Sequence, residues 1–168
     1  MKSQGQQLII LRGNSGSGKS SVARALRERM GYGTAIVEQD YIRRTLLREH
    51  DRPNQPNIEL IRLNVEFALS HGYDVILEGI LPEKHYGEML RTLVSDHNGK
   101  SLVYYFDISL EETFRRHWTK PNSQDFGEEK MRSWYVDKDV LGISGEKIIP
   151  ENSEFDDTVA TILEDITS

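Results

Sequence analysis

The stretch "GNSGSGKS", Gly13 to Ser20, is the segment whose residue types and spacing best suit chemistry, because it matches G-x-x-x-x-G-K-[ST] in full. Glycine lets backbone N–H groups converge on an anion and adopts dihedral angles that other residues avoid. In such a loop Lys19 can reach the β- and γ-phosphates of a nucleotide, and the Ser20 hydroxyl can ligate Mg²⁺. We therefore expect a nucleotide site formed by Gly13, Asn14, Ser15, Gly16, Ser17, Gly18, Lys19, Ser20 and Ser21.

The segments on either side of this loop have the patterns that a phosphate-binding loop needs. The apolar run Leu8 to Leu11 before it is typical of a buried strand. After it, apolar residues recur at helical spacing from Lys19 to Met30, and a helix that begins near Lys19 adds a partial positive charge at its N-terminus. A flexible turn that matches by chance is the alternative, and the strand-loop-helix context favours phosphate binding.

Short apolar runs alternate with segments of helical spacing along the rest of the chain. This alternation predicts a parallel sheet covered by helices on both faces. We expect strands over residues 7–13, 34–39, 73–79, 101–107 and 146–151, with helices between them, including a short one over 41–49.

Three motifs, Gly13–Ser20, "EQDYIRR" and "VILEG", give the chain a resemblance to small P-loop kinases. It resembles phage polynucleotide kinase, chloramphenicol phosphotransferase and the zeta-toxin kinases. The resemblance implies a three-layer α/β P-loop NTPase fold, in which helices cover both faces of a five-stranded parallel sheet of order 2-3-1-4-5. It also implies a mobile lid, and ATP as the phosphoryl donor.

Asp40 and Arg43 are the candidate residues on the acceptor side. Asp40 ends the second predicted strand, and ligands of such sheets lie beyond the carboxyl ends of the strands. An aspartate there can take the proton of an attacking hydroxyl, and Arg43, one helical turn on, can clamp an anionic group. The resembled kinases use an aspartate at this place as the base. In the alternative interpretation Asp40 only caps the following helix.

Two acidic residues compete for the metal side of the site. Glu78 follows the third predicted strand, and Asp107 follows the fourth. The resemblance favours Glu78, together with Ser20, for the Mg²⁺ shell. Asp107 then serves as a cap or a lid contact.

The segment over about 117–135 is the expected lid, because Pro121 and Gly127 interrupt helix formation there. A closing lid can bring arginines to the developing charge once both substrates are bound. We take Arg116 and Arg132 as the candidates. Trp118 and Trp134 are expected to pack in the core of the lid.

Length, charge and composition limit the other possibilities. The 168 residues suit a single P-loop kinase domain over 1–168. Lys and Arg number 21 against 27 Asp and Glu, so a net charge of −6 leaves no global electrostatic attraction to nucleic acid. The absence of cysteine excludes thiolate chemistry and fits the cytoplasm, and the apolar run near the N-terminus is too short for a membrane span. The oligomeric state is not predicted.

The sequence therefore favours an ATP-dependent, Mg²⁺-requiring phosphotransferase that acts on a hydroxyl of a small molecule. In this assignment the catalytic residues are Asp40, Lys19, Arg43, Arg116 and Arg132. A 5′-hydroxyl end of a nucleic acid is the alternative acceptor, which the D-x-x-R spacing of Asp40 and Arg43 supports. A regulatory, slowly hydrolysing nucleotide-binding module is the alternative from another class. The acceptor pocket is expected over residues 40–57 and in the loop after Glu78.

Overall fold

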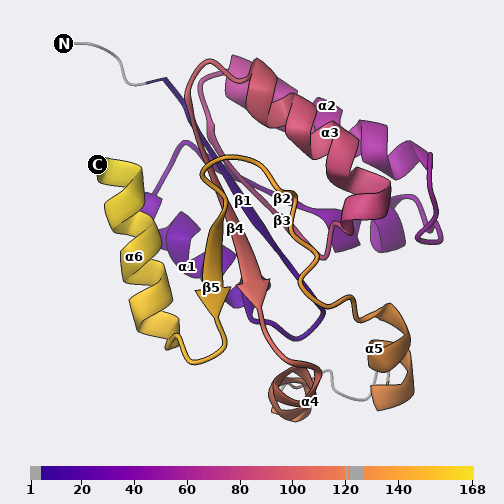
Figure 1. The fold of residues 1–168 in the computed structure, drawn as a ribbon. Coiled ribbons are helices and arrows are strands. Elements are labelled where there is room, and N and C mark those ends of the chain that lie inside the picture. The colour runs from indigo at the N-terminus through magenta and orange to yellow at the C-terminus, as the bar shows by residue number, and fades with distance from the viewer. Residues whose placement is uncertain (1–4, 120, 122–126) are drawn as a thin grey trace.

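The computed structural model describes residues 5–119, 121 and 127–168, and it has a three-layer α/β architecture (Figure 1). The strands are β1 (Gln7–Gly13), β2 (Thr34–Glu38), β3 (Asp74–Gly79), β4 (Lys100–Asp107) and β5 (Lys147–Pro150). The helices are α1 (Lys19–Met30), the π-helix η1 (Tyr41–Leu46), α2 (Pro56–Ser70), α3 (Glu83–Asp96), α4 (Leu110–Trp118), α5 (Glu128–Trp134) and α6 (Phe155–Thr167).

All strand pairs of the sheet are parallel, and the strand order is β2-β3-β1-β4-β5. The first strand is central because its apolar run is buried on both faces: Leu8 lies beside Val75 of β3 and beside Ser101 of β4. The predicted fold class and strand order are confirmed.

Successive side chains of the strands point to opposite faces of the sheet and pack into two separate hydrophobic layers. Leu8 and Ile10 of β1 pack into the cluster that includes α2 and α3. Ile9 and Leu11 pack into the cluster that includes α1 and α6, on the other face of the sheet (Figure 1). The two clusters therefore bury β1 from both sides and position the start of the loop that follows it.

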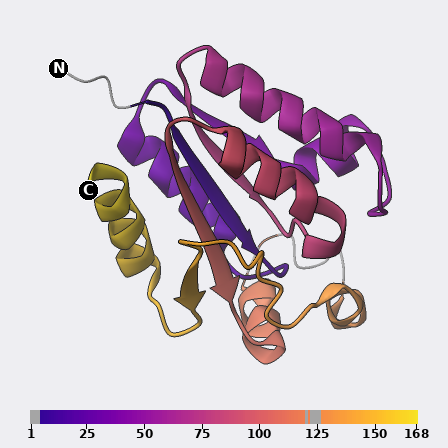
Figure 2. The ribbon, with the colours of Figure 1, turned by 45° about the horizontal axis from the view of Figure 1, so that its top comes forward.

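The carboxyl ends of the parallel strands lie at one edge of the sheet, where the loops after β1, β2 and β3 meet. The helices α4 and α5 lie beyond this edge (Figures 1 and 2). In doubly wound sheets this edge is where ligands bind.

Two local predictions differ from the structure. The expected helix over 41–49 is shorter and is a π-helix, in which the N–H of Leu47 donates to the carbonyl of Ile42 at 3.0 Å. The expectation that Trp118 and Trp134 pack in a lid core is wrong, because both side chains are exposed. The expected lid spans the end of α4 and all of α5, and part of it, 120 and 122–126, lies outside the described residues.

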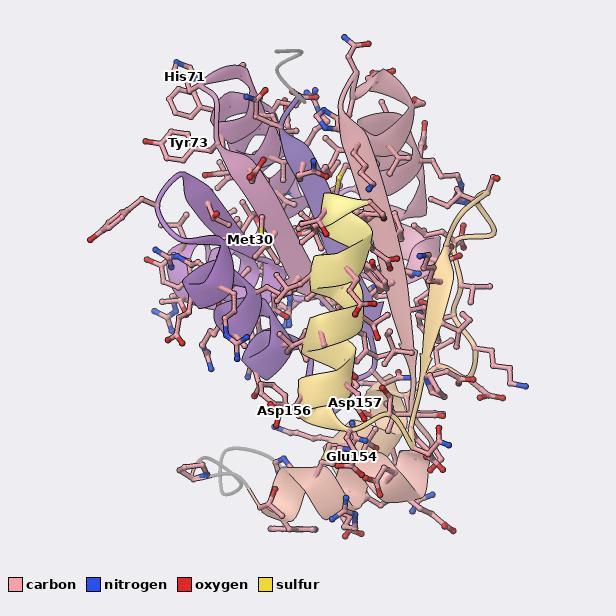
Figure 3. The ribbon with its side chains drawn as sticks, turned by 90° about the vertical axis from the view of Figure 1, so that its left-hand side faces the viewer. Met30, His71, Tyr73, Glu154, Asp156 and Asp157 are labelled. Atoms are coloured by element: carbon pink, nitrogen blue, oxygen red, sulfur yellow. The ribbon has the colours of Figure 1, made fainter. Side chains whose placement is uncertain are left out.

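Acidic and aromatic side chains gather at opposite ends of the face that α6 covers (Figure 3). Asp156 and Asp157 occupy the first turn of α6, where negative charge is stabilised by the helix dipole. His71 and Tyr73 lie at the far end of the molecule.

Among residues 5–119, 121 and 127–168, no helix is long and apolar enough to cross a membrane.

Candidate active site

The glycines of the loop after β1 occupy positions that other residues would strain. Gly13, Gly16 and Gly18 have φ values of 147°, 79° and 93°. A Cβ on Gly13 would lie 2.9 Å from the carbonyl oxygen of Phe106, and one on Gly16 would lie 2.9 Å from that of Thr113. The loop therefore packs its backbone against β4 and α4, which only glycine permits.

The Lys19 ammonium lies inside this loop. Its Nζ donates to the carbonyl oxygen of Asn14 at 2.9 Å and to the Ser17 hydroxyl at 3.0 Å, and the residue is 6% exposed. The charge is thus held by the backbone of the loop at the N-terminus of α1. A nucleotide phosphate bound there would meet both the ammonium and the helix terminus.

Ser20 and Glu78 meet beside the loop, although they are far apart in the sequence. The Ser20 hydroxyl donates to Oε1 of Glu78 at 3.1 Å. Glu78 is 5% exposed, and burial raises the pKa of its carboxyl, while the Lys19 ammonium and the Ser20 hydrogen bond oppose the rise. A hydroxyl and a carboxylate are oxygen donors of the kind that Mg²⁺ prefers, so these two residues fit the predicted metal site.

One cavity of about 1000 Å³ joins this loop to the loops after β2 and β3. It brings together Lys19, Ser20 and Glu78 with the acceptor-side candidates Asp40 and Arg43. Both segments expected to form the acceptor pocket contribute to its wall, and so does α5. The other lining residues used below are Arg44, Arg48, Glu49, His50, Asp51, Arg52, Lys84, His85, Lys130 and Trp134.

Asp40 presents a carboxylate that is 65% exposed between two arginines. Its oxygens lie 3.6 Å from the guanidinium of Arg43 and 3.4 Å from that of Arg44. The Asp40 side chain makes no capping hydrogen bond to η1, so the capping alternative is not what the geometry shows. Arg43 also donates to the carbonyl of Glu49 at 3.1 Å, and its Nε is buried without a hydrogen-bond partner in the described part of the chain.

The two lid arginines have different surroundings. Arg116 donates from Nη1 to the carbonyl oxygen of Ser17 at 2.9 Å, so its guanidinium contacts the phosphate-binding loop. Arg132 lies over the ring of Phe114, with 5.3 Å from Cζ to the ring centroid. Neither residue is among the described residues that line the cavity, and the structure brings only Arg116 to the loop.

The remaining predicted site residues lie around the loop. Ser15, Gly16 and Gly18 line the cavity together with Lys19 and Ser20. Ser21 is exposed on α1, and Asn14 and Ser17 are buried. Asp107, the alternative metal acid, is not among the described lining residues.

Asn14 connects the loop to the chain that leaves α5. Its Nδ2 donates to the carbonyl oxygen of Val136 at 2.7 Å, and its Oδ1 accepts from the Val136 N–H at 2.9 Å. This pair of hydrogen bonds fixes the C-terminal end of the expected lid on the phosphate-binding loop.

Sequence reasoning missed the residues that shape the loop after β3. Leu81 has a φ of 44°, a strained conformation for a buried leucine. The Gln39 Oε1 accepts from its N–H at 2.9 Å, and the fully buried Arg12 donates from Nη2 to its carbonyl oxygen at 2.9 Å. The only signal was an arginine inside an otherwise apolar strand.

A five-stranded parallel sheet of this order, with a glycine loop that leads into α1 and an aspartate, Asp40, shortly after β2, defines a protein of the P-loop kinase class. A family model described as "AAA domain" matches residues 8–134. That match covers more than half of the chain, and the chain belongs to this family.

Two curated relatives resemble part of the chain. It is 32% identical over 122 residues to the bifunctional enzyme NodQ of Rhizobium sp. (strain BR816), an alignment that covers 69% of this chain and 19% of that protein. It is 32% identical over 117 residues to the adenylyl-sulfate kinase of Vibrio cholerae serotype O1, covering 66% of this chain and 54% of that protein. The chain thus spans about half or less of the length of these relatives.

Among solved structures, the chain is similar to the Mycobacterium tuberculosis APS kinase CysC in complex with AMPPNP and APS. The TM-score is 0.66 at 17% identity, and the match covers 98% of this chain and 99% of that one. At this identity the likeness concerns the fold alone.

Proposed function

We propose that this chain is an ATP-dependent kinase that moves the γ-phosphoryl group of ATP to a hydroxyl of a small molecule. The observation that carries the proposal is the single cavity that Lys19 and Ser20 line on one side and Asp40 on another. A nucleotide whose phosphates occupy the glycine loop would direct its γ-phosphate into the space that Asp40 faces.

In the proposed reaction the acceptor oxygen attacks the γ-phosphorus, and the bond from this phosphorus to the oxygen that bridges it to the β-phosphorus breaks. ADP leaves with the electron pair of that bond. The proton of the hydroxyl goes to a carboxylate oxygen of Asp40, which its two arginine neighbours orient. Lys19 and Arg43 stabilise the negative charge of the transferring group.

Ser20 and Glu78 would hold Mg²⁺, which neutralises phosphate charge when it is bound. Their contact at 3.1 Å places a hydroxyl and a carboxylate on the same side of the glycine loop. The name of the Vibrio cholerae relative, adenylyl-sulfate kinase, also supports phosphoryl transfer.

The test is Mg²⁺-dependent release of ADP from ATP, measured with hydroxyl compounds of several classes. The panel contains nucleosides, sugars, sugar acids, phosphorylated and sulfated alcohols, and 5′-hydroxyl oligonucleotides. We expect at least one small molecule to stimulate ADP release, and Asp40→Asn to abolish the stimulation while ATP still binds. Asp156→Asn removes an exposed carboxylate from α6, away from the cavity, and serves as the matched control.

The outcome separates the proposal from its alternatives. Slow ADP release that no acceptor stimulates, and that Asp40→Asn leaves unchanged, would favour the regulatory module. Stimulation by oligonucleotides alone would favour the nucleic-acid end.

A further inference from the structure

The cavity carries more positive charge than the chain as a whole. The whole chain has 27 Asp and Glu against 21 Lys and Arg. Among the described lining residues, however, Lys and Arg outnumber Asp and Glu. The acidic residues of the first turn of α6, Asp156 and Asp157, which Figure 3 labels, are not among these described lining residues.

The acidic side chains of the cavity already have polar partners. Asp40 pairs with two arginines, and Glu78 accepts from Ser20. Glu49 accepts from the backbone N–H and the side-chain amide of Asn57, at 3.0 Å and 2.9 Å. Asp51 lies 3.2 Å from Nδ1 of His85.

Four basic side chains of the lining have no such partner. All four are exposed, and they make no hydrogen bond or ion pair with the described ranges 5–119, 121 and 127–168. They are Arg48, Arg52, Lys84 and Lys130. Unpaired cations around a polar cavity favour an anionic ligand.

Two of these cations, Arg52 and Lys84, belong to segments that are in contact with each other. The contact of Asp51 with His85 links the loop after η1 to the first turn of α3. Arg52 and Lys84 are the chain neighbours of these two residues, and both line the cavity. Arg52 therefore belongs to the loop after η1 and Lys84 to the first turn of α3, two segments that the contact between Asp51 and His85 joins.

We propose that the acceptor carries an oxyanion apart from its reacting hydroxyl, and that Arg52 and Lys84 bind this oxyanion. The inference rests on the proposed function, because it names the class of acceptor for the same site. Guanidinium and ammonium groups bind phosphate, sulfate and carboxylate through charge-assisted hydrogen bonds. A neutral nucleoside or sugar would leave these cations unmatched.

The first test measures binding of inorganic sulfate to the full chain with AMPPNP and Mg²⁺ present, so that the glycine loop is already occupied. Titration calorimetry is run on the wild type, on the double variant Arg52→Gln and Lys84→Gln, and on Arg29→Gln. Arg29 is an exposed cation of α1 that does not line the cavity. We expect the double variant to bind sulfate at least about tenfold more weakly and Arg29→Gln to match the wild type. Equal sulfate affinity in all three proteins would overturn the inference.

The second test compares acceptors that differ in an oxyanion, in the assay of ADP release. Glycerol is compared with glycerol 3-phosphate, glucose with gluconate, and a diol with its monosulfate ester, which keeps one free hydroxyl. We expect the oxyanion-bearing member of at least one pair to stimulate ADP release more than its neutral partner. The member that stimulates most then identifies the oxyanion class as phosphate, carboxylate or sulfate. The double variant should raise the KM of that acceptor at least about tenfold. Equal stimulation by the neutral member of each pair would overturn the inference.

The two tests separate the failure of the inference from that of the proposed function. If the double variant binds sulfate more weakly but no acceptor stimulates ADP release, the inferred anion site would be supported and the proposed kinase function would be contradicted. If neutral acceptors are phosphorylated and all variants bind sulfate equally, the proposed kinase function would be supported and the inferred anion site would be contradicted.

Discussion

The glycine loop (Gly13–Ser20) and the part of the wall that carries Arg52 and Lys84 border the same cavity but are built differently. In the loop, Lys19, Asn14 and Ser20 are engaged by hydrogen bonds to the backbone or to buried groups. In that part of the wall, Arg52 and Lys84 are exposed and unpaired within the described chain. One region is already organised, and the other consists of side chains that a ligand would have to order.

This difference agrees with the roles that we propose for the two regions. Phosphate binding by backbone N–H groups needs a fixed main chain, which the buried strand β1 and the glycine dihedral angles provide. Recognition of an acceptor by charged side chains needs a cavity of suitable size and charge instead. Relatives with the same fold can therefore share the loop and differ in the wall.

The largest effects should come from removing one charge on each side of the cavity. Lys19→Ala should lower kcat/KM for ATP by about 10³-fold, because it removes a preorganised cation at the phosphates. Asp40→Asn should lower kcat by about 10²- to 10⁴-fold and move the KM for ATP by less than about threefold. Steady-state kinetics with a stimulating acceptor measures both. A KM for ATP that rises in parallel with the loss of kcat in Asp40→Asn would contradict the division into two sides.

Of the two lid arginines, we expect Arg116 to have an intermediate effect on the KM for ATP and Arg132 to have a small one. Arg116→Gln should raise the KM for ATP about tenfold, because it removes the guanidinium that contacts the carbonyl of Ser17. Arg132→Gln should change it by less than about twofold. Arg29→Gln, which removes an exposed cation of α1 that does not line the cavity, is the control. A larger effect from Arg132 than from Arg116 would show that the lid places its arginines differently during turnover.

Asn14→Ala tests how firmly the loop is anchored. The change removes two hydrogen bonds to Val136, and the free energy of unfolding should fall by about 2 kcal/mol. Urea unfolding measures it. Asn64→Ala, which changes an exposed asparagine of α2, should shift the free energy by less than about 0.5 kcal/mol. Equal stability of the two variants would mean that the loop does not depend on this anchor.

Glu78→Gln should give the smallest change in the stability of the metal-free protein, and this change depends on pH. Burial raises the pKa of Glu78 in the folded chain, so ionisation of this carboxyl costs stability. The folded state holds the proton more tightly than the unfolded state. The protonated Glu78 therefore contributes its full stability below the pKa of the unfolded chain, near 4.5. This contribution is lost as the pH rises through the higher pKa of the folded chain.

Thermal melts of the metal-free proteins between pH 4 and pH 8 check this sign. The stability of the wild type relative to Glu78→Gln should decline as the pH rises from 4 to 8. A relative stability that increases with pH would contradict it. Glu78→Gln should also weaken the binding of Mg²⁺ with ATP.

The sequence by itself determined the loop and the general fold. Gly13 to Ser20 is one continuous segment, and glycine is needed there for local backbone reasons. Apolar runs long enough to be buried on both faces predict a parallel sheet with helices on either side. The spacing of Asp40 and Arg43 predicts their proximity, which the 3.6 Å contact confirms.

Only the tertiary structure decided which distant residues meet. Ser20 contacts Glu78 across 58 positions of sequence, and residue type alone did not separate Glu78 from Asp107. Arg116 reaches the loop and Arg132 does not, although both looked alike as lid arginines. Arg52 and Lys84 look like ordinary surface residues in the sequence, because the charge of a cavity wall depends on how the chain brings separate segments together.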